Sequence, residues 1–290
     1  MADDLGMGDL SYLGGQPQTP HIDQLAAGGL RLDNFHAYPV CSPSRAALLT
    51  GKSPLRLGLA WTPLPPWSDR GLPEGVPTIA DLLKAQNYFT AIVGKWHLGH
   101  SAAGQHPNRR GFEHFYGCIT GSVDYWTHRG RRGGLDWQRN GESVLEQGYA
   151  TDLLALEAKR LIQKHDFARP MFLYVPFTAP HQPLQAPKGQ YPEYEKINDP
   201  ARHTYCVMVT EMDRAIGEII RSLKERGQYQ NTLIVFLSDN GGAKDQGANN
   251  STYRGGKGSV FEGGIKVPAL LHWPARLPAG GCSSEFTSLL

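Results

Sequence analysis

The sequence lacks the features that mark several classes of protein. Its four cysteines, at positions 41, 118, 206 and 282, are scattered and have neither the paired spacing of a zinc site nor the density of a disulfide framework. No apolar run approaches membrane-spanning length, and no secretory-signal pattern opens the sequence. The 29 basic and 27 acidic residues leave a net charge of +2, which does not indicate a nucleic-acid-binding or membrane-surface protein.

The residue pattern that is present fits a loop-rich α/β enzyme. The 290 residues suffice for one large domain or two smaller ones, and 34 glycines and 21 prolines are spread along the chain. Residues 101–148 are interpreted as an aromatic-lined insertion near the mouth of a pocket. Periodicity and turn residues predict helices over 19–28, 78–86, 151–164 and 203–226, and strands over 30–35, 88–93, 170–177, 232–237 and near 267–272.

A segment that begins at Cys41 has the pattern of a helix N-terminus. Ser42 can cap the helix, Pro43 suits its first position and Gly51 suits its C-terminal end. Cys41 would then lie where unpaired backbone N–H groups and the helix dipole favour an anion. Arg45 follows one turn later, so its guanidinium can reach the same place. A nucleophile, a positive helix end and an arginine predict a site for a tetrahedral oxyanion.

Two other interpretations of this segment remain open from the residues alone. An isolated cysteine is more often a buried structural residue, and Arg45 could be an ordinary surface side chain. A thiolate phosphatase also combines a cysteine with an arginine. Its arginine stands six positions after the cysteine, where this chain has Ala47.

Oxygen-bearing side chains gather in two predicted loops. Asp3 and Asp4 stand near the start of the chain, and Asp239 and Asn240 follow the strand predicted over 232–237. Each pair could belong to an ordinary turn, because Asp and Asn favour turns. Together they offer three carboxylates and an amide carbonyl, a set that suits Ca²⁺, or Mg²⁺, better than zinc.

Four more polar side chains stand beyond predicted strands or in a glycine-rich turn. Lys95 and His97 follow one strand on the same side of an extended segment, and His181 follows another. Open α/β sheets carry functional groups at such positions. Lys257 lies in a basic, glycine-rich loop and could hold an anion. The alternatives are an exposed lysine, structural histidines and a flexible surface loop, but we expect the four to converge near Cys41.

Taken in order, these motifs resemble those of the type I, formylglycine-dependent sulfatases over nearly the whole chain. The most specific of them is Cys41-Ser42-Pro43-Ser44-Arg45 with its helical continuation. The other matching segments are Ala2-Asp3-Asp4-Leu5-Gly6, Gly94-Lys95-Trp96-His97-Leu98-Gly99, His181, Ser238-Asp239-Asn240-Gly241, and Lys257 with Phe261-Glu262-Gly263-Gly264. The segments most similar to the arylsulfatase B and N-acetylgalactosamine-sulfatase branch are Asp33-Asn34-Phe35, Arg110-Gly111-Phe112 and His181-Gln182-Pro183-Leu184.

The resemblance implies a fold as well as a family. It leads us to expect a sulfatase catalytic domain over residues 1–290, with a central mixed, mostly parallel sheet, helices on both faces and an alkaline-phosphatase-like architecture. It also leads us to expect a further strand before Asp3 and a C-terminal domain after Leu290, so the chain is interpreted as a fragment of a longer protein. The full-length protein is expected to be secreted, lysosomal or periplasmic.

The resemblance also implies ligands and a nucleophile. Asp3, Asp4, Asp239 and Asn240 would bind Ca²⁺, or Mg²⁺, together with the modified Cys41. In the family, a formylglycine-generating enzyme oxidises this cysteine to Cα-formylglycine. The aldehyde hydrate is the nucleophile that forms a covalent sulfo-enzyme.

The remaining residues receive roles by the same resemblance. Arg45, Lys95 and His97 would hold and polarise the hydrate. His181 and Lys257 would face the sulfate ester, and His181 would protonate the leaving alcohol.

The implied function is hydrolysis of a sulfate monoester, either an aryl sulfate or a sulfated sugar of the glycosaminoglycan type. One alternative is a formylglycine-dependent phosphodiesterase or phosphonate monoester hydrolase with the same nucleophile. Another is a catalytically inactive relative that only binds sulfated glycans. The sequence does not identify the substrate, because residues 58–76 and 119–146 differ most between members of the family.

Overall fold

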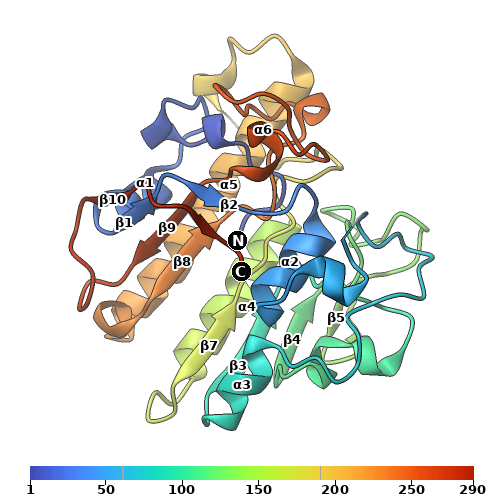
Figure 1. Ribbon diagram of the computed structural model, residues 1–290. Helices are drawn as coiled ribbons and strands as arrows, with labels where there is room; N and C mark the ends of the chain where they lie inside the picture. Colours follow the sequence, from blue (N-terminus) through green and yellow to red (C-terminus); the bar gives the residue numbers. More distant parts are fainter. Residues whose placement is uncertain (61, 190) are drawn as a thin grey trace. The chain divides into compact units, whose positions relative to one another are not determined.

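The computed structural model describes residues 1–60, 62–189 and 191–290. The chain divides into two compact units, each of which contains helices and a β-sheet (Figure 1). The first unit comprises Met1–Pro39 and Ala179–Ser288, and the second comprises Val40–Thr178 and Leu289–Leu290.

The first unit contains a four-stranded sheet in the order β10-β1-β9-β8, and a separate parallel pair of β2 and β11. β1 pairs in parallel with β10 and antiparallel with β9, which in turn pairs antiparallel with β8. Ala2 adds an isolated parallel bridge to Ser238, directly after β8. The strands are β1 (Leu30–Leu32), β2 (Phe35–His36), β8 (Ile234–Leu237), β9 (Ala269–His272), β10 (Gly281–Ser283) and β11 (Thr287–Ser288).

Two helices pack together in the first unit, α1 (Pro20–Ala27) and α5 (Pro200–Glu225). The side chain of Asp199 caps α5 by accepting the Ala201 N–H at 2.9 Å. Most apolar residues of α5 are buried, with Met208 and Met212 fully enclosed, while Ile216 and Ile219 are partly buried. A short helix, α6 (Glu262–Ile265), and the 3-10 turns Met7–Asp9, Ser11–Leu13, Pro192–Tyr194, Tyr229–Asn231 and Lys244–Gln246 complete the unit.

Asp213 of α5 caps the start of α1. Its carboxylate accepts the N–H groups of His21 at 3.0 Å and Ile22 at 2.8 Å. Thr19, which precedes α1, makes no capping bond with its own side chain. A residue almost 200 positions away therefore satisfies the amides that a local cap ordinarily serves. Burial raises the pKa of Asp213 to about 7 although these two donors favour the charged form.

The second unit contains a five-stranded sheet in the order β6-β5-β4-β3-β7. β3 lies between β4 and β7 and pairs in parallel with both, whereas β4–β5 and β5–β6 are antiparallel (Figure 1). Both α3 and α4 pack against β3, which is buried over most of its length. The strands are β3 (Phe89–Val93), β4 (His114–Gly117), β5 (Gln138–Arg139), β6 (Glu142–Ser143) and β7 (Met171–Tyr174), and the helices are α2 (Cys41–Thr50), α3 (Ile79–Ala85) and α4 (Ala150–Lys164), with 3-10 turns at Pro54–Leu57, Ala103–Gln105 and Pro107–Arg109.

The observed architecture confirms a mixed α/β fold but corrects four expectations. The described strands form separate sheets instead of one central sheet, and their ladders are parallel in four cases and antiparallel in four, so the fold is not mostly parallel. The strand predicted over 30–35 is two strands separated by a turn at Asp33 and Asn34. Residues 101–148 include the core strand β4, which its His-Phe-Tyr-Gly sequence did not reveal.

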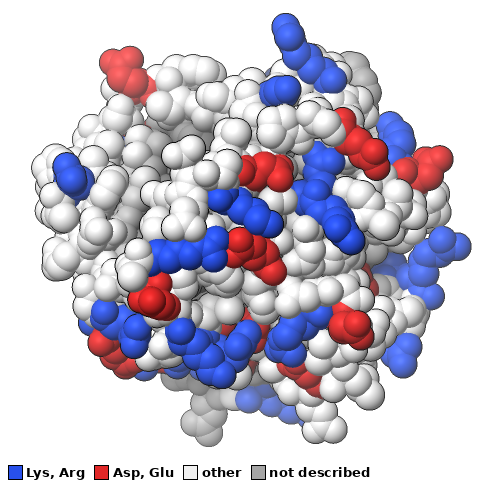
Figure 2. Space-filling view, turned by 90° about the horizontal axis from the view of Figure 1, so that it is seen from below, with Lys and Arg blue, Asp and Glu red and all other residues white. Residues whose placement is uncertain are grey.

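Two features of the structure concern charge on the surface and membrane-spanning helices. On the face that Figure 2 displays, basic and acidic side chains are interspersed. Among the residues that the structure describes, no helix is both long and apolar enough to cross a membrane.

Candidate active site

Cys41 occupies the first position of α2 in the second unit. Val40 precedes it with an extended backbone, and Gly51 ends the helix in the left-handed conformation with its N–H donating to Ala47 O at 2.8 Å. Cys41 is 1% exposed and lies in the first turn, where unpaired N–H groups favour an anion. The sequence predicted the helix end correctly.

The predicted capping role of Ser42 is wrong. The helix begins at Cys41, two residues earlier than the predicted first position at Pro43, so Ser42 lies inside its first turn. Its hydroxyl oxygen instead accepts the N–H of Leu64 at 3.0 Å. This bond ties the start of α2 to the loop that leads toward α3.

Arg45 and Lys95 bring two buried cationic side chains into the same unit as Cys41. Both residues have no exposed surface. The Arg45 guanidinium donates from Nη1 to the backbone oxygen of Lys95 at 2.8 Å. The segment after β3 is therefore fastened to α2, one helical turn beyond Cys41.

The backbone around Lys95 is unusual at two positions. Gly94 has φ +140°, and a Cβ atom there would lie 2.0 Å from the carbonyl oxygen of Pro176, so only glycine fits. His97 adopts the left-handed conformation with φ +58°, at a cost of about 1 kcal/mol or more. Its Nε2 lies 2.9 Å from the carbonyl oxygen of Leu64. Such strain in a buried histidine is typical of functional segments.

The first unit carries a carboxylate–amide cluster formed by Asp3, Asp4, Asp239 and Asn240, all at most 2% exposed. Asn240 donates from Nδ2 to Asp4 Oδ1 at 2.7 Å, and the Asp4 N–H donates to Asp239 Oδ1 at 3.3 Å. The bridge from Ala2 to the end of β8 places the two loops beside each other. Residues from opposite ends of the chain thus meet as the sequence predicts.

His181 and Lys257 lie against this cluster. Lys257 Nζ is 2.7 Å from Asp4 Oδ2, and His181 Nε2 is 3.7 Å from the same oxygen. Ligand atoms of Asp3, Asp4 and His181 lie within 4.8 Å of one another, a spacing that could hold a metal ion. Both predicted substrate-facing side chains therefore share an oxygen of Asp4.

The pKa of Asp4 reflects these neighbours. Burial alone would raise its pKa, but the positive charges of His181 and Lys257 outweigh that effect and hold the pKa below its ordinary value. The residue also adopts a left-handed backbone, with φ +66°. Asp4 is consequently a buried, ionised carboxylate on a strained loop.

The cluster fits a hard divalent cation. Lys257 and a protonated His181 would offset two of the three carboxylate charges, so a negative charge would remain among buried side chains. Asn240 Oδ1 is buried and accepts no hydrogen bond from any residue that the structure describes. An amide oxygen beside carboxylates is a ligand set that Ca²⁺ accepts and that Mg²⁺ also uses.

A second layer of polar residues lies behind the cluster, and the sequence did not predict it. The hydroxyl oxygen of Tyr205, on α5, lies 3.0 Å from both Asp4 O and Asp9 Oδ2, and it also accepts the Gly6 N–H at 3.4 Å. Arg202 forms an ion pair with Asp9. The sequence does not indicate this role for Tyr205, because no local pattern connects it with Asp4.

The predicted site residues fall into two sets. Within the first unit the structure groups six of them: Asp3, Asp4, His181, Asp239, Asn240 and Lys257. Arg45 contacts the segment that carries Lys95 and His97 in the second unit, one turn after Cys41. It stays a prediction that both sets act on one substrate. It also stays a prediction that Cys41 shares the cation.

Comparison with known proteins identifies the class. The sulfatase family model matches residues 1–290, and the chain belongs to the sulfatase family. It is 37% identical to arylsulfatase J of Mus musculus over 296 residues, which covers the whole chain and 50% of that protein. It is 36% identical to N-acetylgalactosamine-6-sulfatase of Homo sapiens over 317 residues, which covers the whole chain and 59% of that protein. The chain thus spans about half to three fifths of these relatives.

Solved structures show the same architecture. A crystal structure of Ps i-CgsB in complex with k-i-k-neocarrahexaose superposes with a TM-score of 0.92 at 38% identity, over the whole chain and 68% of that structure. The PsFucS1 sulfatase from Pseudoalteromonas sp. gives 0.80 at 32% identity, over the whole chain and 64% of that structure. A phosphonate monoester hydrolase of Agrobacterium radiobacter, at 20% identity and a TM-score of 0.67, shows the fold alone.

Proposed function

We propose that this chain carries the catalytic residues of an enzyme that hydrolyses sulfate monoesters of a sugar. The observation that carries the proposal is the carboxylate–amide cluster, in which the buried Asn240 Oδ1 accepts no hydrogen bond from any described residue. It occurs in a chain matched to the sulfatase family from residue 1 to residue 290. The fold alone would leave the reaction open, since one fold serves several chemistries.

The second unit would supply the nucleophile and charge stabilisation. Oxidation of Cys41 to formylglycine would supply a hydrated aldehyde in the first turn of α2. Arg45 and Lys95 are buried, so their charges would act on the sulfate oxygens in a medium of low dielectric constant. His97 would orient the nucleophile from its constrained backbone position.

The first unit would supply the cation and the proton. A calcium ion held by Asp3, Asp4, Asp239 and Asn240, with Cys41 as a further ligand, would offset charge on the sulfate. Lys257 would add a second positive charge at the leaving oxygen.

His181 has the hydrogen bonding that proton transfer requires. Its Nδ1 lies 2.6 Å from the carbonyl oxygen of Gln182, so Nδ1 carries a hydrogen. Nε2 is then the atom that would hold the proton for the leaving alcohol.

A sulfated glycan is the substrate class that the relatives favour. The similar Ps i-CgsB structure contains an oligosaccharide, and the N-acetylgalactosamine-6-sulfatases are named for a sulfated sugar. We extend this class to the present chain, together with a formylglycine-generating enzyme as the maturation partner and a secreted, lysosomal or periplasmic location. The identity of the sugar is left to experiment.

The proposal is tested by the ratio of sulfate to phosphate ester hydrolysis. Protein carrying this chain would be produced with a formylglycine-generating enzyme and assayed on 4-nitrophenyl sulfate and 4-nitrophenyl phosphate, beside the Cys41→Ser variant. We expect multiple turnovers on the sulfate, a lower rate on the phosphate and no turnover by the variant. Preference for the phosphate would favour the phosphodiesterase alternative, and binding of sulfated glycans without turnover would favour the inactive relative.

A further inference from the structure

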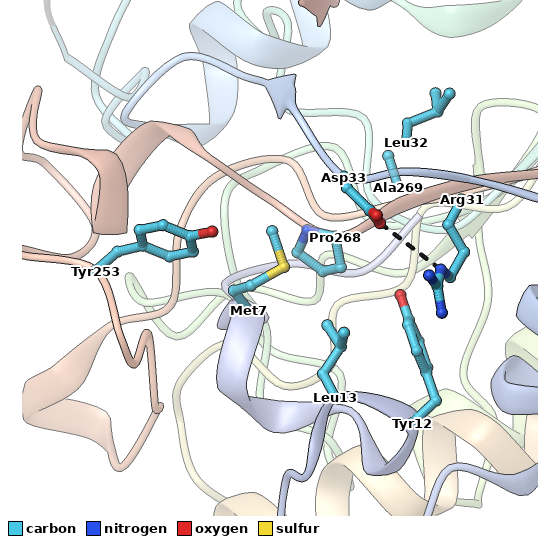
Figure 3. Close-up of a pocket in the computed structure, with 9 residues that line it drawn as sticks. All are labelled: Met7, Tyr12, Leu13, Arg31, Leu32, Asp33, Tyr253, Pro268 and Ala269. Carbon is cyan, nitrogen blue, oxygen red and sulfur yellow. Dashed lines mark ion pairs between the residues drawn. The ribbon is translucent and has the colours of Figure 1, made fainter. Parts of the chain in front are cut away.

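A cavity of about 190 Å³ opens in the first unit outside the carboxylate–amide cluster (Figure 3). It is smaller than the roughly 300–1,000 Å³ of pockets for drug-sized ligands, so it has room for one small unit. Its polar lining comes from Tyr12, Arg31, Asp33 and Tyr253. The mechanism above uses none of these residues.

The sheet register relates this cavity to the cluster. Ala269, which lines the cavity, pairs with Leu237, the last residue of β8, and Ser238 and Asp239 follow directly. Because β1 and β8 both pair antiparallel with β9, their carboxyl ends point to the same edge of the sheet. Asp33 follows β1 at that edge as Asp239 follows β8. Two strand spacings separate β1 from β8, roughly 10 Å.

Polar groups of the cavity can make further hydrogen bonds. Arg31 Nε lies 3.7 Å from Asp33 Oδ1, an ion pair whose side chains are 38% and 47% exposed. That nitrogen makes no hydrogen bond with any described residue. In Figure 3 the Tyr12 hydroxyl points toward this pair. Burial raises the pKa of Tyr12 to about 12, so its hydroxyl keeps its proton and can donate.

The remaining walls are apolar or aromatic. Met7 and Leu13 approach from the turns that precede α1, and Pro268 closes another side (Figure 3). Lys266 Nζ lies 5.0 Å from the centroid of the Tyr253 ring. An apolar wall beside a guanidinium, a carboxylate and a hydroxyl matches a pyranose ring, which has a C–H face and a rim of hydroxyl groups.

We propose that this cavity binds one unsulfated pyranose unit of the glycan whose sulfate is hydrolysed, with Arg31 and Tyr12 donating to its hydroxyls and Asp33 accepting from them. The Arg31–Asp33 pair is neutral as a whole, which favours an uncharged unit over a second sulfate. Its lining residue Asp33 follows β1, two strands away from the end of β8, so the unit would belong to the same glycan as the sulfated one. This inference rests on the proposed function for the identity of the glycan.

Binding of neutral sugars tests the inference without any turnover. Methyl galactopyranoside and methyl glucopyranoside would be titrated into the wild-type protein and into the Arg31→Gln, Tyr12→Phe and control Arg132→Gln variants, with NMR as the readout. We expect at least one sugar to bind in the millimolar range, about tenfold more weakly to Arg31→Gln and unchanged to the control. Thermal unfolding would verify that each variant is folded, and Tyr12→Phe serves if Arg31→Gln is not.

The outcomes separate this inference from the proposed function. Absence of binding by either sugar, or binding that neither variant weakens, would overturn it. Arg31-dependent binding of inorganic sulfate, with no effect on the sugars, would make the cavity an anion site and contradict us. Arg31-dependent sugar binding by protein that hydrolyses no sulfate ester would support the sugar site and contradict the proposed function. If both hold, the ratio of kcat/KM for k-i-k-neocarrahexaose over 4-nitrophenyl sulfate should fall about tenfold in Arg31→Gln.

Discussion

Asn240 donates from Nδ2 to Asp4 Oδ1 across 2.7 Å, and this bond fixes the direction of its amide. The same nitrogen donates to the carbonyl oxygen of Gly241 at 2.9 Å, so both amide hydrogens are used. Oδ1 is thereby left as a buried acceptor without a donor among the described residues. An unsatisfied buried group of this kind costs about 1–3 kcal/mol. A cation at Oδ1 would remove that cost.

Replacement of Asn240 by alanine tests this assignment. The change removes one oxygen ligand and the bond to Asp4, so we expect Ca²⁺ affinity to fall at least about tenfold. Isothermal titration of metal-free protein measures the affinity without any assay of activity. Asn34→Ala, in the same unit, is the matched control and should bind Ca²⁺ as the wild type does. Equal affinities in the two variants would exclude Asn240 as a ligand.

Tyr205 is expected to position the loop that carries Asp3 and Asp4. Tyr205→Phe deletes a hydroxyl that contacts the Asp4 carbonyl, Asp9 and the Gly6 N–H. We predict a loss of about 1–3 kcal/mol in unfolding free energy together with Ca²⁺ affinity weakened about 10-fold or more.

Tyr229→Phe is the control for that experiment, because it deletes a hydroxyl 2.7 Å from His272 Nε2 in the same unit. This control should lower stability and leave Ca²⁺ binding as it was. If the two variants weaken Ca²⁺ binding equally, Tyr205 has no specific role in the site.

The sequence predicted the site better than the sheets that carry it. Asp239 stands out locally because it lies two residues after β8, and His181 because it follows the apolar segment that contains β7. Strand pairing is a long-range property, however. Neither the Leu237–Ala269 register nor the pairing of β3 with β4 leaves a signal in the segments themselves.

The second layer of the site was missed for a related reason. Asp9 and Tyr205 are almost 200 residues apart, and each has an ordinary local role, in a turn and on an apolar helix stripe. Asp213 likewise reads as one charged position on α5, although it caps α1. Contacts of this kind become visible only in three dimensions.

Asp213 should make stability depend on pH. Its pKa is raised from 3.8 to about 7 in the folded protein, so between these values the folded state holds a proton that the unfolded state has lost. This contribution to stability is fully present below the lower value and is lost as pH rises through 7. Urea unfolding at pH 5 and pH 7.5 should show the wild type losing roughly 1–3 kcal/mol more than Asp213→Asn over this interval.

The exposed Asp245, replaced by asparagine, provides the control for the pH experiment. Its profile should follow that of the wild type. If the unfolding free energies of Asp213→Asn and the wild type changed equally with pH, the two N–H donors would be keeping this carboxylate ionised. The predicted direction of the pH dependence would then be wrong.

Gly94 should be intolerant of a side chain. Gly94→Ala places a Cβ atom 2.0 Å from Pro176 O and also disfavours the backbone at φ +140°. Gly141→Ala is the matched control in the same unit, since φ is +91° there but no atom lies within 4 Å of the added carbon. Thermal unfolding should show about 1 kcal/mol lost by the control and about 1–3 kcal/mol more by Gly94→Ala. Equal losses of stability in the two variants would contradict the steric clash predicted for Gly94→Ala.

The central claim is that Cys41 becomes the nucleophile of a sulfatase. The most direct measurement compares the fraction of Cys41 converted to the aldehyde, determined by mass spectrometry of its peptide, with specific activity on 4-nitrophenyl sulfate. Preparations made with different amounts of formylglycine-generating enzyme would supply the range. We predict that activity is proportional to the converted fraction and vanishes when that fraction is zero. Full turnover by protein whose Cys41 is an unmodified thiol would contradict the account.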